Sequence, residues 1–218
     1  MSKLKAVVFD SDGTIFNTFE LICAAYRHVA NTHNLRVPTP DEIKIQLGKS
    51  LPDIFKTFYP EHNIQELLNT NNQYVAANAM KSEAFHGIEE LLQFLKEKQL
   101  QLSILTSVSS KVYDILDHHN LTTYFTSVVH HEKINRPKPD PEGFLLACKE
   151  CDVEPQEAIM VGDTTQDIAT GKNAKAFATI AVTHGYGLAQ DLIDANADYV
   201  VSDLNGVKDV IAKLLQCK

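Results

Sequence analysis

Short apolar runs alternate with amphipathic helical stretches along most of this chain, and this alternation constrains the fold more than any other feature. The apolar runs have the length and the aliphatic content of buried strands, and they occupy residues 4–9, 102–105, 127–129, 158–161, 178–182 and 199–201. Helical spacing of apolar residues is found at 87–98, 111–119, 141–151, 167–173 and 207–215. Strands that alternate with helices predict an α/β fold, with a mostly parallel Rossmann-like sheet covered by helices on both faces.

Residues 15–84 interrupt this alternation, because they contain no convincing strand and have the pattern of several helices. A crossover between parallel strands needs far fewer than these roughly 70 residues. We therefore predict a separate helical domain over 15–84, inserted into an α/β core made of 1–14 and 85–218. A helical module inserted beside the end of the first strand suits a lid over a site.

The composition limits the class of protein. The 218 residues are 44% hydrophobic and carry a formal net charge of −8, which is typical of a globular chain and disfavours nucleic acid as the main partner. No apolar run approaches the roughly 20 residues that cross a bilayer, and no secretory signal follows Met1. We expect a cytoplasmic monomer or weak homodimer without a membrane partner.

The cysteines are expected to be reduced thiols in that setting. Cys148 and Cys151 have the spacing of a redox or metal motif, but they lie within a helical pattern and have no second ligand pair nearby. We therefore interpret them as structural helix residues. Cys23 and Cys217 complete the set of four.

Two carboxylates end the first apolar run. Asp10 follows Phe9 directly, and Asp12 precedes Gly13, which permits a tight turn. Ligands bind at the carboxyl ends of strands in open α/β sheets. Acids held this close repel each other unless a cation or a shared proton intervenes. The pattern predicts a divalent-metal site with a nucleophilic carboxylate, and the alternative is a strand that ends in an Asp-Gly turn.

Phosphate-binding groups follow later in the chain. Thr106 and Ser107 end the strand at 102–105, where hydroxyls and backbone N–H groups suit phosphate oxygens. The alternative is that one of them caps the next helix. Lys138 lies between prolines that restrict the backbone, so its ammonium is suited to neutralise acids and a phosphoryl group together. An exposed charged turn is the alternative for Lys138.

A second acidic pair follows the strand at 158–161. Asp163 comes just after this strand, and Asp167 lies four residues later at the start of a helix. With Asp10 and Asp12 they offer four acids to a hard cation such as Mg²⁺. The alternative is that Asp163 is only a turn residue and that Asp167 is only an acid in the first turn of a helix, where its charge suits the helix dipole.

These groups, in this order, resemble the four motifs of the haloacid dehalogenase-like (HAD) superfamily. Asp10–Thr14 matches Asp-x-Asp-Gly-Thr, Thr106 matches the strand-end Ser or Thr, Lys138 matches the Lys motif, and Gly162-Asp163 with Asp167 matches Gly-Asp-x-x-x-Asp. The resemblance spans essentially the whole chain. It implies a HAD-like core, and a helical cap between the first two motifs places the chain near the phosphoglycolate phosphatase and β-phosphoglucomutase branch.

The resemblance implies a Mg²⁺-dependent phosphatase that hydrolyses a small phosphomonoester metabolite through an aspartyl-phosphate. Asp10 would be the nucleophile, and Asp12 would act as acid and then as base. Lys138 would supply positive charge, while Thr106 and Ser107 would bind the phosphoryl oxygens. Where phosphoglycolate phosphatase-like chains commonly carry Lys, this chain has Val108, which disfavours phosphoglycolate.

The implied metal ligands are Asp10, Asp12 through its backbone carbonyl, and Asp163. Asp167 would support this set or orient Lys138.

Within the insertion, Gly48–Leu51 resembles the specificity loop of the family, which makes Lys49 and Ser50 candidates for substrate contact. A solvated loop lysine is the alternative for Lys49.

Other activities stay open at this point. A β-phosphoglucomutase-like sugar-phosphate mutase shares every motif, and a phosphonate hydrolase would use a cap lysine such as Lys49 for a Schiff base. Asp12 disfavours a dehalogenase, because a departing halide needs no acid. A catalytically silent HAD-fold module would have lost a reacting group, whereas all of them are present.

Overall fold

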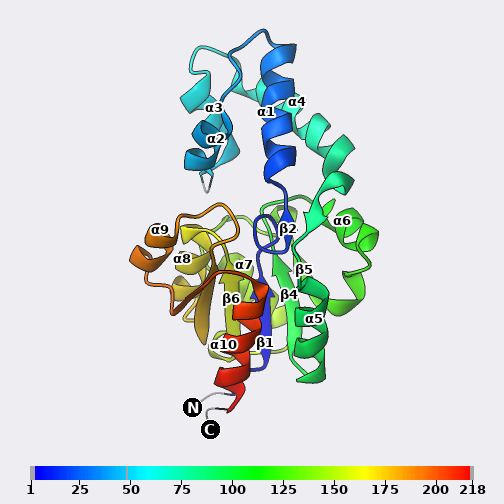
Figure 1. Cartoon of the computed structure of the whole chain (residues 1–218), viewed down its shortest axis with the longest axis vertical. Helices are drawn as coiled ribbons and strands as arrows, with labels where there is room; N and C mark the ends of the chain where they lie inside the picture. The colour runs from blue at the N-terminus through cyan, green and yellow to red at the C-terminus, as the bar shows by residue number, and fades with distance from the viewer. Residues whose placement is uncertain (1–2, 48, 217–218) are drawn as a thin grey trace. The chain divides into compact units, whose positions relative to one another are not determined.

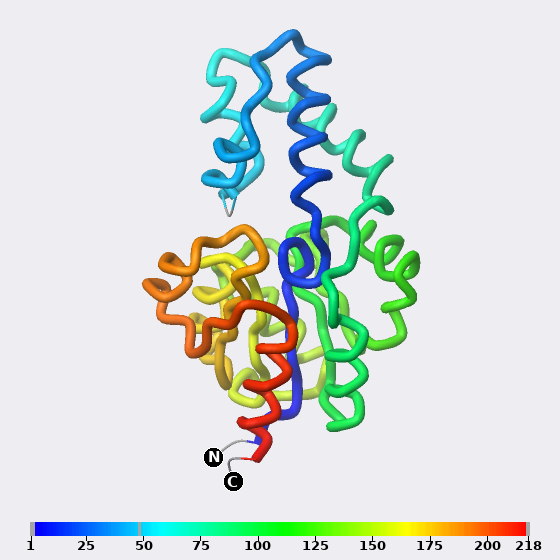
Figure 2. The backbone as a smooth tube through the Cα atoms, viewed as in Figure 1, coloured from blue at the N-terminus to red at the C-terminus, as the bar shows by residue number. Residues whose placement is uncertain are grey.

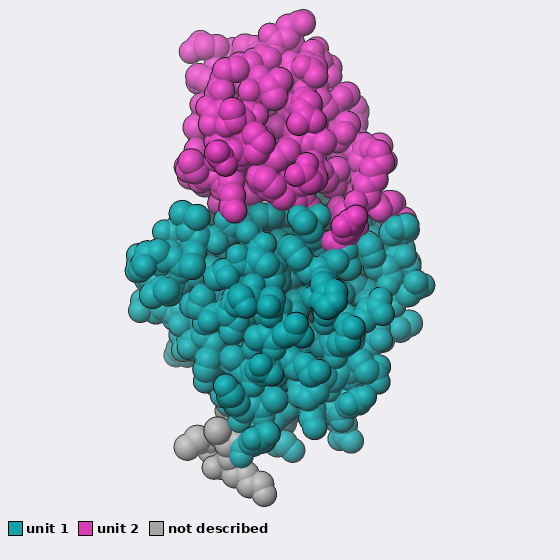
Figure 3. Space-filling view, in the orientation of Figure 1, with its two compact units in different colours: residues 1–17, 84–218 teal, residues 18–83 magenta. Residues whose placement is uncertain are grey.

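The structure, a computed structural model, describes residues 3–47 and 49–216. The chain divides into two compact units (Figure 3). Unit 1 consists of Met1–Asn17 and Ala84–Lys218, and unit 2 of Thr18–Glu83. The backbone passes into unit 2 after Asn17 and re-enters unit 1 at Ala84 (Figure 2). No described helix is long and apolar enough to cross a membrane.

Unit 1 is built on a six-stranded sheet with the order β5-β4-β1-β6-β7-β8 (Figure 1). The strands are β1 (Ala6–Phe9), β4 (Gln101–Leu105), β5 (Ser127–Val129), β6 (Ala158–Gly162), β7 (Ala178–Val182) and β8 (Tyr199–Val201). Each neighbouring pair is parallel. The predicted α/β fold with a mostly parallel sheet is confirmed.

The order of the strands reverses at β1. From β1 the chain continues to β4 and β5 on one side, and it then returns to β6 on the other side. Such a reversal is the topological switch point at which open α/β sheets bind ligands. Phe9 pairs with Ile104 of β4 and with Val161 of β6, so the residues after these three strands emerge at one edge of the sheet.

Helices cover both faces of this sheet (Figure 1). They are α5 (Ile88–Glu97), α6 (Val112–His118), α7 (Glu142–Glu150), α8 (Thr165–Asn173), α9 (Ala189–Asp194) and α10 (Leu204–Gln216). Ala6 and Val8 of β1 pack against Phe144 and Ala147 of α7. All four residues of β1 are buried, as expected for a central strand of a parallel sheet.

The cysteines have structural positions. Cys148 lies in α7, Cys151 follows its last residue, and both are buried free thiols, as is Cys23 in unit 2. Burial raises the pKa of Cys148 to about 12 and that of Cys151 to about 11. Thiols with such pKa values are inert at neutral pH. Cys217 lies outside the described residues.

Unit 2 is a helical bundle with its own core. It contains α1 (Phe19–Thr32), α2 (Pro40–Gln46), α3 (Leu51–Phe58), α4 (Ile64–Asn78) and a 3₁₀ turn at Ala79–Lys81. The core gathers Tyr26 of α1, Phe55 of α3 and Leu67 of α4. A capping box between Thr39 and Glu42 begins α2.

The expectation that residues 15–84 contain no strand is wrong at both ends of that segment. β2 (Phe16–Asn17) and β3 (Glu83–Ala84) form a two-stranded sheet where the chain leaves and re-enters unit 1. Strands of two residues are too short to produce a hydrophobic period, so pairing between distant segments, not local pattern, defines them. The helix α9 was also not predicted from the sequence.

Candidate active site

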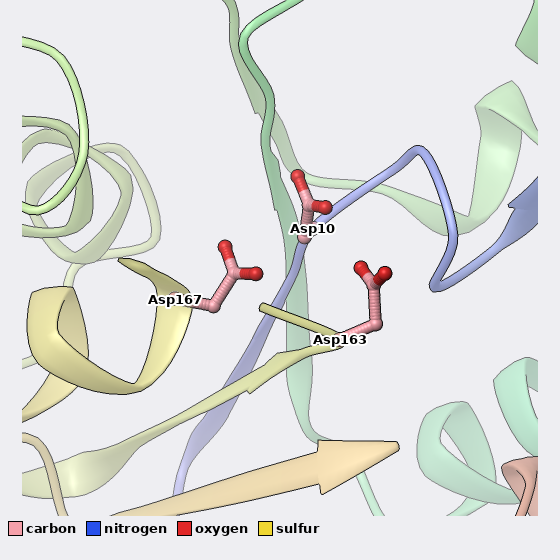
Figure 4. A group of neighbouring side chains, drawn as sticks. All are labelled: Asp10, Asp163 and Asp167. Atoms are coloured by element: carbon pink, nitrogen blue, oxygen red, sulfur yellow. The ribbon is translucent and has the colours of Figure 1, made fainter. Parts of the chain in front are cut away.

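Three buried aspartates converge at the carboxyl edge of the sheet (Figure 4). Asp10 follows β1, Asp163 follows β6, and Asp167 lies in the first turn of α8. One carboxylate oxygen from each lies within 4.8 Å of the others. The parallel sheet explains this convergence, because β1 and β6 are hydrogen-bonded neighbours that end at the same edge.

Lys138 is buried among these acids. Its Nζ lies 2.7 Å from Oδ1 of Asp10 and 2.6 Å from Oδ1 of Asp167, and its side chain is 8% exposed. Ion pairs from Arg136 to Asp140 and Glu142 fix the segment that carries it. The alternative of an exposed charged turn is therefore wrong for Lys138.

The charges in this cluster are unbalanced. Burial raises the pKa of Asp10 well above its ordinary value, and burial with the Asp167 carboxylate raises that of Asp163 to about 7. Burial opposes the charge of Lys138, but the Asp10 and Asp167 carboxylates outweigh it and raise its pKa. One ammonium thus faces three carboxyl groups. An all-oxygen donor set with excess negative charge fits a hard divalent cation such as Mg²⁺.

Asp163 is held by groups from two loops. Oδ1 accepts a hydrogen bond from Thr14 Oγ1 at 3.0 Å, and Oδ2 accepts one from the backbone N–H of Tyr186 at 2.8 Å. Gly13, with φ of +80°, approaches so closely that a side-chain carbon there would lie 2.3 Å from Oδ2. Neither donor was predicted from the sequence. The Asp-x-Asp-Gly-Thr motif contains Thr14, but a backbone N–H leaves no trace in the sequence.

Asp167 has two structural roles. Its Oδ2 accepts hydrogen bonds from the N–H of Thr164 at 3.0 Å and from its Oγ1 at 2.6 Å, which completes a capping box at the start of α8. Its Oδ1 accepts the hydrogen bond from Lys138. Asp167 is therefore an acid in the first turn of α8, as the alternative interpretation held, and the same carboxylate also forms an ion pair with Lys138.

The other candidates of unit 1 lie in the loops after β1 and β4. Asp12 is half-buried, in the turn that Gly13 closes with a hydrogen bond to Phe16. Thr106 is buried directly after β4, and its Oγ1 accepts a hydrogen bond from the N–H of Val108 at 3.1 Å. Ser107 is exposed. Because α6 begins at Val112 after Lys111, neither Thr106 nor Ser107 caps it, and that alternative is wrong.

The candidates in unit 2 have local roles there. Lys49 is exposed, and its Nζ donates a hydrogen bond to Oε1 of Gln46 at 2.8 Å. Ser50 is the N-cap of α3 and accepts a hydrogen bond from the N–H of Asp53. Gly48, the first residue of the predicted specificity loop, lies outside the described residues.

Comparison with known proteins gives the family. Residues 7–182 match the family described as haloacid dehalogenase-like hydrolase. A Clostridium perfringens protein, provisionally named pyrophosphatase PpaX, is 32% identical over 213 residues, which are 97% of this chain and 99% of the relative. The chain therefore belongs to the haloacid dehalogenase-like hydrolase family, and the predicted resemblance is confirmed.

Solved structures agree with the fold. A predicted phosphatase from Clostridium acetobutylicum superposes with a TM-score of 0.85 at 26% identity, covering 97% of this chain and 100% of the other. A β-phosphoglucomutase from Clostridium difficile gives 0.80 at 22% identity, covering 98% and 97%. The second likeness concerns the fold alone. The fold and the family make this chain an enzyme of the hydrolase class.

Proposed function

We propose that this chain is a Mg²⁺-dependent phosphatase that hydrolyses a small phosphomonoester through an aspartyl-phosphate on Asp10. The observation that carries the proposal is the ion pair between Lys138 and Asp10 within the cluster of three buried carboxyl groups. This arrangement places a nucleophile beside a fixed positive charge at the ligand-binding edge of the sheet. Membership of a hydrolase family supports it.

In the first step, a carboxylate oxygen of Asp10 forms a bond to phosphorus while the bond from phosphorus to the leaving oxygen breaks. Asp12 donates its proton to that oxygen, so the alcohol leaves neutral. Asp12 suits this task because it is the half-buried acid of the pair, in a turn next to the nucleophile. Burial raises the pKa of Asp10, and the Lys138 ammonium beside it acts in the opposite direction by favouring the ionised carboxylate.

In the second step, water attacks phosphorus and the bond to Asp10 breaks. Asp12, now ionised, accepts the proton of the water, which restores both carboxyl groups and releases inorganic phosphate. Thr106 is assigned to the phosphoryl oxygens because it lies one residue beyond β4, which pairs with the strand that carries the nucleophile. The exposed hydroxyl of Ser107 is assigned to the same oxygens.

Asp10, the backbone carbonyl of Asp12, and Asp163 would hold the cation. When bound, Mg²⁺ supplies positive charge that offsets the repulsion between carboxylate and phosphate. Asp167 is assigned to orienting Lys138, because its Oδ1 accepts a hydrogen bond from Lys138 Nζ at 2.6 Å.

A second substrate class has its own support. The Clostridium perfringens relative carries the name of a pyrophosphatase and aligns over nearly its whole length with this chain. Inorganic pyrophosphate is therefore the second candidate substrate. Its leaving group is phosphate, which departs without full protonation, so this reaction depends less on Asp12 than ester hydrolysis does.

We assign substrate selection to the helical unit at 18–83, as a cap domain. The support is its place in the sequence, directly after the loop that carries Asp10 and Asp12, together with its own hydrophobic core. Lys49 is its candidate for an anionic group on the substrate. Replacing Lys49 by Ala is expected to raise the KM for the physiological substrate several-fold while the kcat for an aryl phosphate stays unchanged.

The test is a panel of phosphate compounds with the full chain in Mg²⁺ and in EDTA, with release of phosphate as the readout. The panel contains sugar phosphates, other alkyl phosphates, p-nitrophenyl phosphate and pyrophosphate. Hydrolysis in Mg²⁺ that is lost in EDTA is expected. Asp10→Asn is expected to lower kcat by about a thousandfold or more, because no other residue replaces the nucleophile.

Two results would contradict the proposal. If no compound is hydrolysed, the aryl phosphate included, the phosphatase assignment is wrong. Interconversion of a sugar phosphate faster than phosphate release would identify a mutase. Trapping of labelled phosphate on the parent, but not on Asp10→Asn, would support the aspartyl-phosphate by a measurement independent of turnover.

A further inference from the structure

The loop from Thr183 to Leu188 joins β7 to α9, and it carries none of the four motifs. Its backbone nevertheless holds Asp163 at two points. The N–H of Tyr186 donates to Oδ2 of Asp163 at 2.8 Å, and the N–H of Gly187 donates to its carbonyl oxygen at 3.1 Å. Both the side chain and the main chain of this aspartate are therefore fixed by the same loop.

Gly185 allows the loop to approach this closely. A side-chain carbon on Gly185 would lie 2.3 Å from Oδ2 of Asp163, 2.5 Å from its Cβ and 2.4 Å from the carbonyl oxygen of Gly13. The last atom belongs to the backbone and cannot rotate away. The φ of Gly185 does not lie in the left-handed region, since the described glycines with positive φ are Gly13 and Gly87. Glycine is needed here for space and not for backbone conformation.

His184 connects this loop to the loop after β1, which carries Asp10 and Thr14. Its Nε2 lies 3.1 Å from the carbonyl oxygen of Thr14, and because a carbonyl only accepts, Nε2 carries the proton. Its ring packs on Phe85 with the centroids 4.0 Å apart. Thr14 in turn donates to the other oxygen of Asp163. The two loops that hold the two oxygens of Asp163 are thus joined to each other through His184.

We propose that the loop His184–Gly187 is a positioning element that fixes the orientation of the Asp163 carboxylate for a divalent cation, with Gly185 as the residue that makes this contact sterically possible. The proposal rests on the proposed function, because it takes Asp163 as a cation ligand. A carboxylate oxygen that accepts one hydrogen bond keeps a second lone pair for a cation. Mg²⁺ demands near-ideal octahedral geometry, so a ligand held in one orientation binds it better than a mobile one.

The test compares the parent with Gly185→Ala. Direct binding of Mg²⁺ is measured by titration calorimetry, and the melting temperature is measured in EDTA and in Mg²⁺. The methyl group displaces the loop from Asp163, so the dissociation constant for Mg²⁺ is expected to rise about tenfold or more. The increase in melting temperature caused by Mg²⁺ is expected to shrink accordingly. In activity assays, the Mg²⁺ concentration for half-maximal kcat rises, whereas the KM at saturating Mg²⁺ changes little.

Gly206→Ala is the matched control. Its added carbon would lie 2.7 Å from Cβ of Val201, between α10 and β8, so it creates a comparable steric conflict without contact to Asp163. We expect it to leave the dissociation constant for Mg²⁺ unchanged. Equal Mg²⁺ binding by Gly185→Ala and the parent would overturn the positioning role.

If Gly185→Ala does not fold, a second pair of variants tests the same proposal. His184→Phe keeps a ring against Phe85 but removes the donor to Thr14, and weaker Mg²⁺ binding is expected. His184→Gln retains a donor and is expected to restore part of the affinity. Unchanged binding by a folded His184→Phe would overturn the proposal. If the proposed function is wrong, the parent itself binds no Mg²⁺. That outcome differs from failure of the positioning role, in which the parent and the variants bind Mg²⁺ equally.

Discussion

Lys138 Nζ lies 2.7 Å from Oδ1 of Asp10, although 128 residues separate them in the chain. The same nitrogen lies 2.6 Å from Asp167, so one cation serves two buried carboxylates. In an enzyme that uses Asp10 as a nucleophile, this ion pair has a catalytic and a structural consequence. It favours the ionised form of the attacking carboxylate, and it lowers the cost of burying the acid cluster.

The stability of the fold is expected to depend on Lys138. Lys138→Met leaves Asp10 and Asp167 without their cation, so the free energy of unfolding at pH 7 should fall by about 3–5 kcal/mol. Lys172→Met is the matched control, because Lys172 lies 2.6 Å from Asp198 in a pair whose side chains are 38% and 40% exposed. That loss should stay within about 1 kcal/mol. Urea denaturation in EDTA measures the free energy of unfolding of both variants. Equal losses would contradict the expectation that the buried carboxylates beside Lys138 depend on it more than exposed Asp198 depends on Lys172.

The proposed role of Asp12 as acid and base predicts that activity depends on the leaving group. Asp12→Asn cannot donate a proton, so kcat for alkyl phosphates should fall by about 10²–10⁴-fold. The fall for p-nitrophenyl phosphate and for pyrophosphate should be much smaller, because these leaving groups depart without full protonation. Steady-state kinetics on the three substrates tests this. Equal losses on all of them would assign Asp12 to metal binding or structure and not to proton transfer.

Asp198 is expected to make stability depend on acid pH. Its partial burial opposes ionisation, but hydrogen bonds from Lys172 and Thr179 outweigh it and hold its pKa below the ordinary value. A lowered pKa contributes stability above the unfolded-state pKa, and this contribution is lost as the pH falls through the folded-state value. Asp198→Asn should therefore cost less than about 1 kcal/mol at pH 7, because its side chain is 40% exposed and solvent screens its charge. The difference from the parent should disappear at acid pH.

Chemical denaturation at a series of pH values measures this effect. Asp209→Asn, at an exposed position on α10, is the control and should not change the pH profile. A constant difference between Asp198→Asn and the parent at all pH values would show that packing, and not the charge of Asp198, carries the effect.

The core of unit 2 can be tested without touching unit 1. Phe55 is fully buried, with ring centroids of Tyr26 and Tyr59 at 5.2 and 6.2 Å. Phe55→Ala should destabilise the helices of unit 2 by about 3–5 kcal/mol. Hydrogen exchange should accelerate in α1 to α4 while β1 and β6 stay protected. Equal acceleration in both units would show that they unfold together. Phe58→Ala, at a partly buried ring, should have a smaller effect.

The strand-end carboxylates were predictable because two local signals coincide on them. A buried apolar run gives a parallel strand, and the acid after it marks the edge at which ligands bind. Asp10 and Asp163 follow this rule directly, and β1 and β6 prove to be neighbours. Lys138 was predicted from its prolines and from the family motif, but its two ion pairs follow from the tertiary fold.

The contacts made by backbone atoms were not predictable. The N–H groups of Tyr186 and Gly187 are the same in every non-proline residue, and the requirement for glycine at 185 depends on where Asp163 lies. The pairing of β2 with β3 joins segments that are distant in sequence. Such features depend on long-range geometry, and a single chain's residue pattern does not encode them locally.

The central position of β1 has a consequence for synthesis. This strand leaves the ribosome before its two neighbours, β4 and β6, which are completed only at Leu105 and Gly162. The nascent chain therefore carries Asp10, the proposed nucleophile, after a strand without partners while the whole of unit 2 is being made. Asp163 gains its last backbone donor only when Gly187 has emerged. The hydrogen-bonded surroundings of Asp163 are thus completed only after Gly187 has been synthesised.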